Sequence, residues 1–308
     1  METNTRTWAA QPDSRLIVIL SSERSGSTLL RVMLGEHSRI VAPQEMFLLR
    51  YADFETWRAQ KPVAMESLLE FFLLLGRPST ESSLDASYRG SSTVEVYRKL
   101  FDHLAQGMFL LDKTPAYAND SATLTRSAGL SPFYIWLIRH PLGVIDSHVR
   151  LKSKLRNNNN RPLPRRMLQP LRDVVERWTG GGLGALARER ETKWLLQNMN
   201  VRNFLRHVPA TNKAVLHFED LVRSPEAIIT GLCNSIGIEP EPQMVRPETR
   251  QVMNPNLGDP NFYLHSGIDS QLAESWAARY DEAQLRTETL QLMHQIGIPS
   301  RRPRHRAA

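Results

Sequence analysis

The segment from Arg15 to Arg31 constrains the fold of this chain more than any other, because it combines a buried strand, a tight turn and a helix. Residues 16–20, Leu-Ile-Val-Ile-Leu, form a short apolar run that predicts a parallel strand covered on both faces. Small polar residues follow, and apolar residues at helical spacing then predict a helix whose first turn contains residues 25–28. The first N–H groups of a helix lack intrahelical partners and carry partial positive charge. The segment therefore predicts an anion-binding site.

Side chains in the same turn favour this interpretation. Gly26 allows a ligand to approach the backbone, and Arg24, Ser27 and Thr28 add hydrogen-bond donors. The alternative is a surface turn in which Ser25 caps an ordinary helix. Because Arg, Gly, Ser and Thr side chains converge on one turn, the anion-binding interpretation is favoured, and residues 24–28 form the candidate binding loop.

A nucleotide triphosphatase P-loop is the obvious competitor for this turn. That motif requires Gly-x-x-x-x-Gly-Lys-Ser/Thr. Here no lysine precedes Ser27 or Thr28, and Leu20 or Ser21 occupies the position of the first glycine. A P-loop kinase is therefore disfavoured, and a phosphate-type loop without an obvious metal-binding partner remains.

A second strand and helix contain another anion-binding pattern. Residues 133–139 predict a buried strand that ends in Arg139, Pro141 predicts the start of a helix, and Ser147 follows Arg139 by eight residues. A bidentate guanidinium and a hydroxyl group suit a terminal phosphate dianion. The alternative for Arg139 is a salt bridge at the end of the strand.

Together these segments resemble sulfotransferases that use 3′-phosphoadenosine 5′-phosphosulfate (PAPS). Arg24-Ser-Gly-Ser-Thr-Leu-Leu-Arg31 is similar to the family's 5′-phosphosulfate loop, and members of the family bind the 3′-phosphate through an Arg and a Ser at the spacing of Arg139 and Ser147. A third segment, 213–226, resembles the strand and Tyr-Glu-Asp-Leu element of the family, with Phe218 in place of the tyrosine, and we expect it to be mainly structural. The resemblance implies that the donor is bound by Arg24, Ser25, Gly26, Ser27, Thr28, Arg139 and Ser147.

The expected fold class is α/β. Candidate strands at 15–21, 107–112, 133–139 and 213–218 alternate with helical stretches, which predicts a central parallel sheet flanked by helices, as in the P-loop-like sulfotransferase fold. No Pro/Ser-rich linker divides the chain, so we expect one domain over 1–308, with flexible ends at 1–14 and 300–308. Ligands bind such sheets at the carboxyl ends of the strands, where Arg24, Lys113 and Arg139 are expected.

Resemblance to further sulfotransferases, the tyrosylprotein sulfotransferases being among the most similar in their motifs, implies two catalytic groups that act together with Arg24. In tyrosylprotein sulfotransferases a loop of this type is followed by a catalytic glutamate at the distance that separates Arg24 from Glu45, which implies that Glu45 is the general base. The alternatives are an exposed glutamate in a turn, or Glu66 or His37 as the base.

The second group is Lys113, in Asp112-Lys-Thr-Pro-Ala-Tyr117, which is similar to the Glu-Lys-Thr-Pro-x-Tyr element of heparan sulfate sulfotransferases. The resemblance implies that Lys113 faces the sulfuryl group and its bridging oxygen. With Arg24 it would neutralise charge on the transferred group and on the departing phosphate. A monoanionic sulfuryl group needs less neutralisation than a γ-phosphate, so we expect no metal.

The acceptor is expected to carry a hydroxyl group. The loop, the Asp112–Ala118 element and Gly258–Asp269 are similar to sulfotransferase domains of polyketide olefin synthases, which sulfate a β-hydroxyacyl chain on an acyl carrier protein. This implies a small-molecule or carrier-bound natural-product acceptor, with 258–269 close to the 3′-phosphate. A peptide tyrosine sulfotransferase and a non-catalytic protein that binds nucleotides or a partner remain alternatives.

Charge and cysteine content limit the partners. The net charge is +7, and residues 150–172 hold eight Lys or Arg residues without an acidic one, together with four consecutive Asn and three Pro. We expect a mobile basic flap rather than a helix throughout, which is either merely solvated or binds the donor's phosphates or an acidic carrier protein. No recognition motif for nucleic acid accompanies the charge.

Cys233 is the single cysteine and is expected to be buried. No apolar run is long enough to cross a membrane, so we expect a cytoplasmic protein without a membrane partner.

Overall fold

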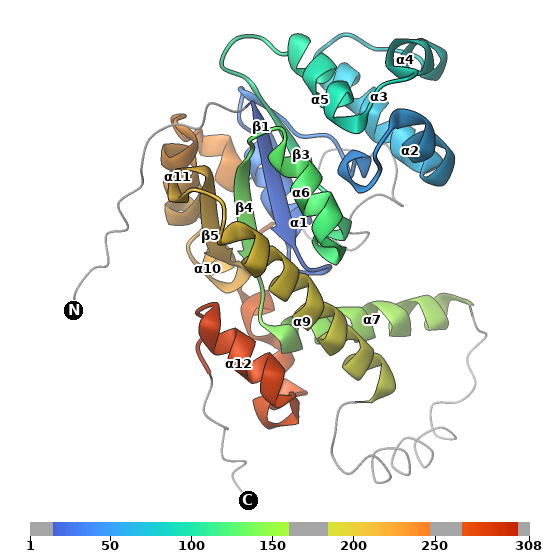
Figure 1. Cartoon of the computed structure of the whole chain (residues 1–308). Helices are drawn as coiled ribbons and strands as arrows, with labels where there is room; N and C mark the ends of the chain where they lie inside the picture. The colour runs from blue at the N-terminus through green and yellow to red at the C-terminus, as the bar shows by residue number, and fades with distance from the viewer. Residues whose placement is uncertain (1–14, 160–183, 247–266, 301–308) are drawn as a thin grey trace, which may run out of the picture.

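A computed structural model describes residues 15–159, 184–246 and 267–300 of the chain (Figure 1). At its centre lies a five-stranded sheet with the order β2-β3-β1-β4-β5, in which every pair of neighbouring strands is parallel. The strands are β1 (Leu16–Ser21), β2 (Ile40–Val41), β3 (Phe109–Lys113), β4 (Phe133–Ile138) and β5 (Lys213–His217). The α/β class with a central parallel sheet is therefore confirmed.

The sequence predicted four of these strands, and their ends differ from the prediction by at most two residues. Strand β1 is central, because Ile17 pairs with Leu111 of β3 on one side and with Phe133 of β4 on the other. The strand that the sequence analysis did not predict is β2. It contains only two residues at the sheet edge, too few to give a periodic signal.

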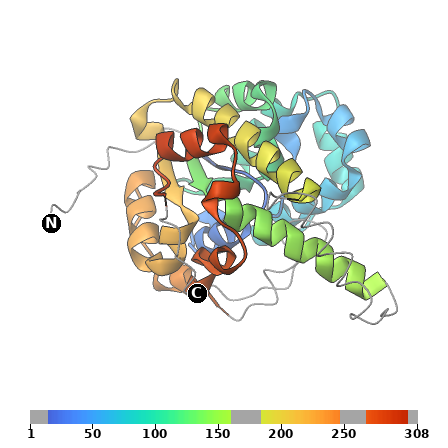
Figure 2. The same cartoon turned by 90° about the horizontal axis from the view of Figure 1, so that it is seen from below.

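Helices cover both faces of the sheet. On one face, Ile17 and Ile19 pack with α1 (Ser27–Gly35) and α11 (Pro225–Ile236), and the short helix α10 (Phe218–Arg223) precedes α11. On the other face, Leu16 and Val18 belong to a larger core with α6 (Ser121–Ala128) and α9 (Ala185–Leu205). Helix α7 (Pro141–Asn159) packs against α9, as the view from below shows (Figure 2), and α12 (Thr287–Gln295) lies near the C-terminus.

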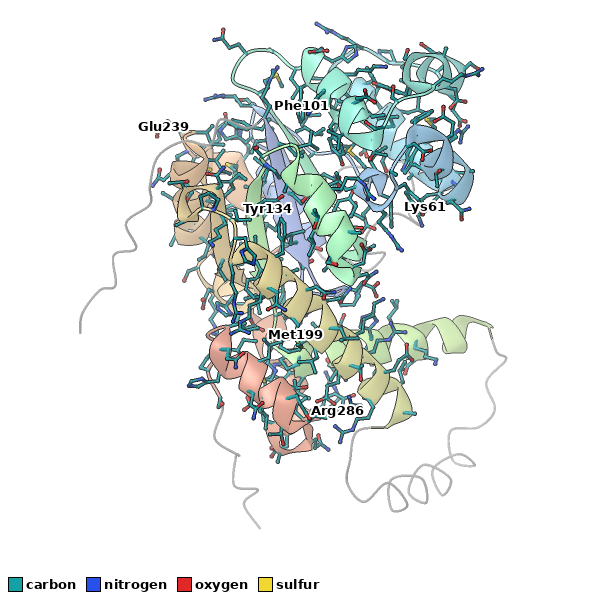
Figure 3. All side chains as sticks on the ribbon, viewed as in Figure 1. Lys61, Phe101, Tyr134, Met199, Glu239 and Arg286 are labelled. Atoms are coloured by element: carbon teal, nitrogen blue, oxygen red, sulfur yellow. The ribbon has the colours of Figure 1, made fainter. Side chains whose placement is uncertain are left out.

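Between β2 and β3 the chain forms a helical layer, which we define as α2 (Phe54–Gln60), α3 (Met65–Leu74), α4 (Glu81–Tyr88) and α5 (Thr93–Asp102). Lys61 and Phe101 mark this layer in Figure 3, and Met199 marks α9. Ser92 and Glu95 form a capping box at the start of α5, and Asp53 caps α2 through the N–H of Thr56. Short 3₁₀ helices occur at 48–50, 62–64, 115–119, 210–212, 242–245, 270–273, 275–278 and 282–284.

Three sequence expectations concern regions at the edge of the described residues. The first part of the basic segment, 150–159, continues α7, so the expected flap is wrong for these residues. An ion pair between Arg150 and Asp146, one helical turn apart, stabilises this continuation. Residues 160–172, most of the 258–269 loop and the termini 1–14 and 301–308 lie outside the described residues.

Two further observations bear on location and cysteine chemistry. Among the residues that the structure describes, no helix has the length and apolarity that a membrane span requires. Cys233 is buried, as expected, and burial raises the pKa of its thiol to about 11. A thiol in this environment stays protonated and acts as a small apolar group.

Candidate active site

The turn between β1 and α1 owes its shape to two left-handed residues, Arg24 with φ 65° and Gly26 with φ 87°. Gly26 caps α1, whose first hydrogen bond runs from the N–H of Leu30 to the Gly26 carbonyl at 3.1 Å. The helix therefore begins at Ser27, and the prediction that Ser25 lies in its first turn is wrong, because a left-handed residue cannot continue an α-helix. The Ser25 hydroxyl lies 2.7 Å from that of Ser22 and does not cap α1.

Gly26 is required at its position by the ring of Phe218. A Cβ atom on Gly26 would lie 2.3 Å from Cδ2 of Phe218, so any other residue would collide with the ring. The same ring lies under Arg139, whose guanidinium carbon is 4.2 Å from the ring centroid. Phe218 thus packs against both the loop and Arg139, which agrees with the structural part expected for its segment.

Arg139 directly follows β4, and its side chain reaches the loop. Its Nη1 donates to the carbonyl of Arg24 at 3.0 Å and its Nη2 donates to the carbonyl of Leu272 at 2.9 Å. Burial lowers the pKa of Arg139 to about 10, although the charge of Glu219 acts in the opposite direction. Among the described residues, the buried Nε of Arg139 has no hydrogen-bond partner. In the part of the chain that the structure describes, Arg139 donates to backbone carbonyls and forms no salt bridge, so the alternative interpretation finds no partner there.

Ser147 also contacts the loop, through the side chain of Arg24. It lies on α7, two turns after Pro141, and its Oγ accepts a hydrogen bond of 3.1 Å from Nε of Arg24. Arg24 therefore contacts both members of the Arg139 and Ser147 pair, one through its carbonyl and one through its guanidinium. The fold therefore brings the loop that contains Arg24 and the segment from Arg139 to Ser147 to one place.

The candidate catalytic residues meet at the carboxyl end of β3. Nζ of Lys113 lies 2.6 Å from Oε1 of Glu45 and 3.3 Å from Oγ1 of Thr28 in the first turn of α1. The Lys113 side chain is 1 % exposed and that of Glu45 is 14 % exposed, so the pair lies at the boundary between core and solvent. The structure thus brings the loop, the lysine and the glutamate together, as the site prediction requires.

The two reserve candidates for the base do not belong to this cluster. The His37 ring lies 2.9 Å from the carbonyl of Glu239 and accepts the N–H of Arg39, at the far end of α1. Glu66 lies in the first turn of α3, and among the described residues it forms no hydrogen bond or ion pair with Lys113 or Thr28. Of the three acidic or basic candidates, only Glu45 contacts Lys113.

The sequence analysis missed the contribution of α9 to the site. Lys193 pairs with Glu23 at 2.5 Å, beside Arg24, and Nε1 of Trp194 donates to the carbonyl of Arg139 at 3.0 Å. His148 lies 4.0 Å from Glu23, and burial lowers its pKa to about 4, helped by Arg190. Arg190, Lys193 and Trp194 lie at helical spacing, which predicts that they share one face of a helix. The sequence does not reveal which strand or loop this face contacts.

The arrangement is suited to the transfer of an anionic group between oxygen atoms. Backbone N–H groups and hydroxyls at the start of α1, with the cations Arg24, Lys113 and Arg139, can hold a polyanion. In the described ranges no group of three or more His, Cys, Asp or Glu side chains is placed to bind a metal ion. A carboxylate at the same point can accept a proton.

Comparisons with known proteins agree with this chemistry. The sequence model of the sulfotransferase family matches residues 17–242. Two solved structures resemble the whole fold. The sulfotransferase domain from the curacin biosynthetic pathway is 28% identical, with a TM-score of 0.76 over 95% of this chain and 100% of that chain. The sulfotransferase domain from the Synechococcus PCC 7002 olefin synthase is 26% identical, with a TM-score of 0.74 over 95% of this chain and 98% of that one. A comparison with curated proteins finds no match.

Proposed function

Because this chain belongs to the sulfotransferase family, we propose that it transfers the sulfuryl group of PAPS to a hydroxyl group of an acceptor. The observation that carries this proposal is the meeting of Lys113 with Glu45 and with Thr28 of the anion-binding loop. The cation Lys113 lies within hydrogen-bond distance of both a proton acceptor, Glu45, and the loop residue Thr28. That is the set of groups that a metal-independent transfer between oxygen atoms requires.

The donor is held at two points. The start of α1, with Gly26, Ser27 and Thr28, binds the 5′-phosphosulfate through N–H groups and hydroxyls. Arg139 and Ser147 bind the 3′-phosphate. The buried Nε of Arg139 has no hydrogen-bond partner among the described residues, so it is available to donate to this phosphate. Arg24 links the two points because it bonds to both Arg139 and Ser147.

The reaction is an in-line displacement at sulfur. The acceptor oxygen forms a bond to sulfur while the bond between sulfur and the bridging oxygen of the donor breaks, and that electron pair goes to the 5′-phosphate. Glu45 takes the proton of the acceptor hydroxyl, and Lys113 with Arg24 stabilises the charge on the departing phosphate. The products are the sulfate ester of the acceptor and 3′-phosphoadenosine 5′-phosphate (PAP).

The acceptor is a hydroxyl group in a natural-product pathway. The two similar structures come from the curacin biosynthetic pathway and from an olefin synthase, which supports an intermediate that is either free or attached to an acyl carrier protein. The net charge of +7 would favour association with an acidic carrier protein.

An acceptor panel tests the proposal. PAPS is incubated with the protein and with a β-hydroxyacyl carrier protein, the corresponding free β-hydroxy acid, or a tyrosine peptide, and mass spectrometry follows both products. We expect one acceptor to gain one sulfuryl unit while an equal amount of PAP appears. PAP binding without transfer to any acceptor would favour the non-catalytic alternative, and a phosphorylated product formed from ATP would favour a kinase.

A further inference from the structure

The backbone around Glu45 is fixed by a dense set of hydrogen bonds. We call residues 44–49 the Glu45 segment; it follows β2 and crosses the carboxyl end of β3. On the side of the helical layer, the N–H of Gln44 donates to Glu70 at 2.6 Å, and Ser67 and Trp57 donate to the carbonyls of Glu45 and Met46 at 3.0 and 2.8 Å. Helices α2 and α3 therefore hold one side of the segment.

Two hydroxyl groups from the β3 region hold its other side. The N–H of Phe47 donates to Oγ1 of Thr114 at 3.3 Å, and the N–H of Leu49 donates to the Tyr117 hydroxyl at 3.3 Å. Phe47 has a φ of 56°, a left-handed conformation that is uncommon for a bulky residue. Such a conformation persists only where the surrounding contacts define it, as these hydrogen bonds do.

Both hydroxyls point their protons at one buried carboxylate. Asp112, which is fully buried, accepts hydrogen bonds from Thr114 at 3.0 Å, from Tyr117 at 2.6 Å and from Tyr97. A hydroxyl has a single proton, so a hydroxyl that donates to Asp112 can offer only lone pairs to the Glu45 segment. The carboxylate therefore determines that Thr114 and Tyr117 accept the backbone N–H groups of Phe47 and Leu49.

Asp112 and Lys113 are adjacent on β3 and act on opposite sides of the sheet. Successive side chains of a strand point to opposite faces. Lys113 accordingly reaches Thr28 on α1, whereas Asp112 reaches Tyr97 on α5. Burial raises the pKa of Asp112 and the charge of Glu45 raises it further, while the three hydroxyl donors act in the opposite direction.

We propose that Asp112 is a positioning residue, which holds the Glu45 segment through Thr114 and Tyr117 so that the Glu45 carboxylate stays beside Lys113. The proposal rests on the proposed function, because it assigns a purpose to the position of the base. Proton transfer depends on a base held in a narrow range of positions, and a shift of about 1 Å can cost up to ~10²-fold in rate. The residues assigned to donor binding lie on other elements, and the hydrogen bonds of Thr114 and Tyr117 do not reach them, so we expect donor affinity to change little when these hydrogen bonds are lost.

Tyr117→Phe tests the proposal, with Tyr134→Phe as its matched control. Tyr117 and Tyr134 are 1% and 2% exposed, and Tyr134 has a hydroxyl partner of its own, Ser127, at 2.7 Å. Tyr134 lies on β4, apart from Lys61 and the helical layer (Figure 3). We expect Tyr117→Phe to lower kcat about 10-fold, with the KM for PAPS and the Kd for PAP within about twofold of the wild type. Both variants lose one buried hydroxyl, so we expect them to lower Tm by similar amounts. Only Tyr134→Phe should keep kcat within about twofold of the wild type.

Thr114 provides a rescue test at the second hydroxyl. Thr114→Val keeps the shape of this buried side chain but removes the hydroxyl, and Thr114→Ser keeps the hydroxyl. We expect Val to lower kcat about 10-fold and Ser to restore most of it, because only the valine variant leaves the N–H of Phe47 without its acceptor. Equal losses in the two variants would mean that packing, and not the hydrogen bond, is what matters.

Amide hydrogen exchange gives a readout that does not require activity. Tyr117→Phe should accelerate exchange at the Leu49 amide, and Tyr134→Phe should not. The proposal is wrong if kcat of Tyr117→Phe falls no further than that of Tyr134→Phe, or if the Leu49 amide exchanges at the wild-type rate. If the wild type transfers no sulfuryl group to any acceptor, the proposed function fails. In that case the difference in exchange rate at the Leu49 amide between the two tyrosine variants still decides whether the Tyr117 hydroxyl, which donates to Asp112, holds the Glu45 segment.

Discussion

The ammonium group of Lys113 lies 2.6 Å from the carboxylate of Glu45, although 68 residues separate the two in the chain. The pair joins the end of β3 to the segment after β2, at the first turn of α1. Removing either charge would leave the other one partly buried without its partner, which is costly in a protein interior. Conservative replacements are therefore the sound way to test each member of the pair.

Glu45→Gln should reduce turnover by roughly 10²-fold or more, because the neutral amide cannot take the proton of the acceptor. The amide oxygen can still accept a hydrogen bond from Lys113, so the Kd for PAP should stay near the wild-type value. Steady-state kinetics with saturating PAPS and calorimetry with PAP measure the two quantities. Glu66→Gln is the matched control and should keep wild-type turnover. If Glu66→Gln loses turnover and Glu45→Gln does not, the base has been assigned to the wrong residue.

Arg139→Lys should weaken recognition of the 3′-phosphate of the donor. Lysine keeps the charge but loses the planar set of donors that binds a phosphate at two points. We expect kcat/KM for PAPS to fall about 10-fold or more, whereas kcat/KM for adenosine 5′-phosphosulfate, which lacks the 3′-phosphate, should change little. Arg223→Lys, an exposed arginine paired with Glu274, serves as the control. Equal losses for both donors would show that Arg139 does not read the 3′-phosphate.

Gly26→Ala should abolish donor binding and destabilise the protein. The new methyl group would lie 2.3 Å from the Phe218 ring, and φ at Gly26 is +87°. Gly90 is a matched control, because its φ is +73° but nothing lies within 4 Å of the added methyl group. Gly90→Ala should cost only about 1 kcal/mol of stability and leave the Kd for PAP unchanged. Calorimetry and thermal unfolding separate the two effects, and similar behaviour of both variants would contradict the close approach at Gly26.

The burial of His148 predicts a dependence of stability on pH. Burial lowers the pKa of His148 from 6.5 to about 4. The positive charges of Arg190, Arg24 and Lys193 lower it as well, whereas the negative charge of Glu23 acts in the opposite direction. Between pH 6.5 and about 4 the unfolded chain binds more protons at this group than the folded chain does, so stability falls as the pH falls. The Tm of the wild type should therefore decrease more steeply across this range than that of His148→Gln. Parallel curves for the two proteins would show that the folded protein tolerates a charged His148.

The sequence was sufficient where a local pattern carries the physics. An apolar strand followed by Arg24 and Gly26 predicts an anion-binding turn, and the spacing of Arg139 and Ser147 predicts a second binding point. The fold brings Arg139 and Ser147 into contact with Arg24, whereas anion binding at either point stays a prediction. The predicted start of α1 is too early, because the sequence pattern does not reveal that Gly26 is left-handed and lies against the ring of Phe218, which is distant in the chain.

The parts that the sequence did not reveal depend on contacts between distant segments. Strand β2 exists because Ile40 and Val41 pair with β3, not because of any local periodicity. The hydroxyls around Asp112 come from α5 and from the 3₁₀ turn after β3, and no spacing in the sequence brings Tyr97 and Tyr117 to one carboxylate. Side chains of α9 reach Glu23 and Arg139 only because α9 crosses the sheet at that point.

Calorimetric titration of the wild-type protein with PAP tests the central claim, that the loop at Gly26 and the guanidinium of Arg139 bind one nucleotide. We predict uptake of one PAP per chain, competition by PAPS, and much weaker binding of adenosine 5′-phosphate, which lacks the 3′-phosphate. A titration without heat of binding for PAP, or equal affinities for PAP and adenosine 5′-phosphate, would contradict the account.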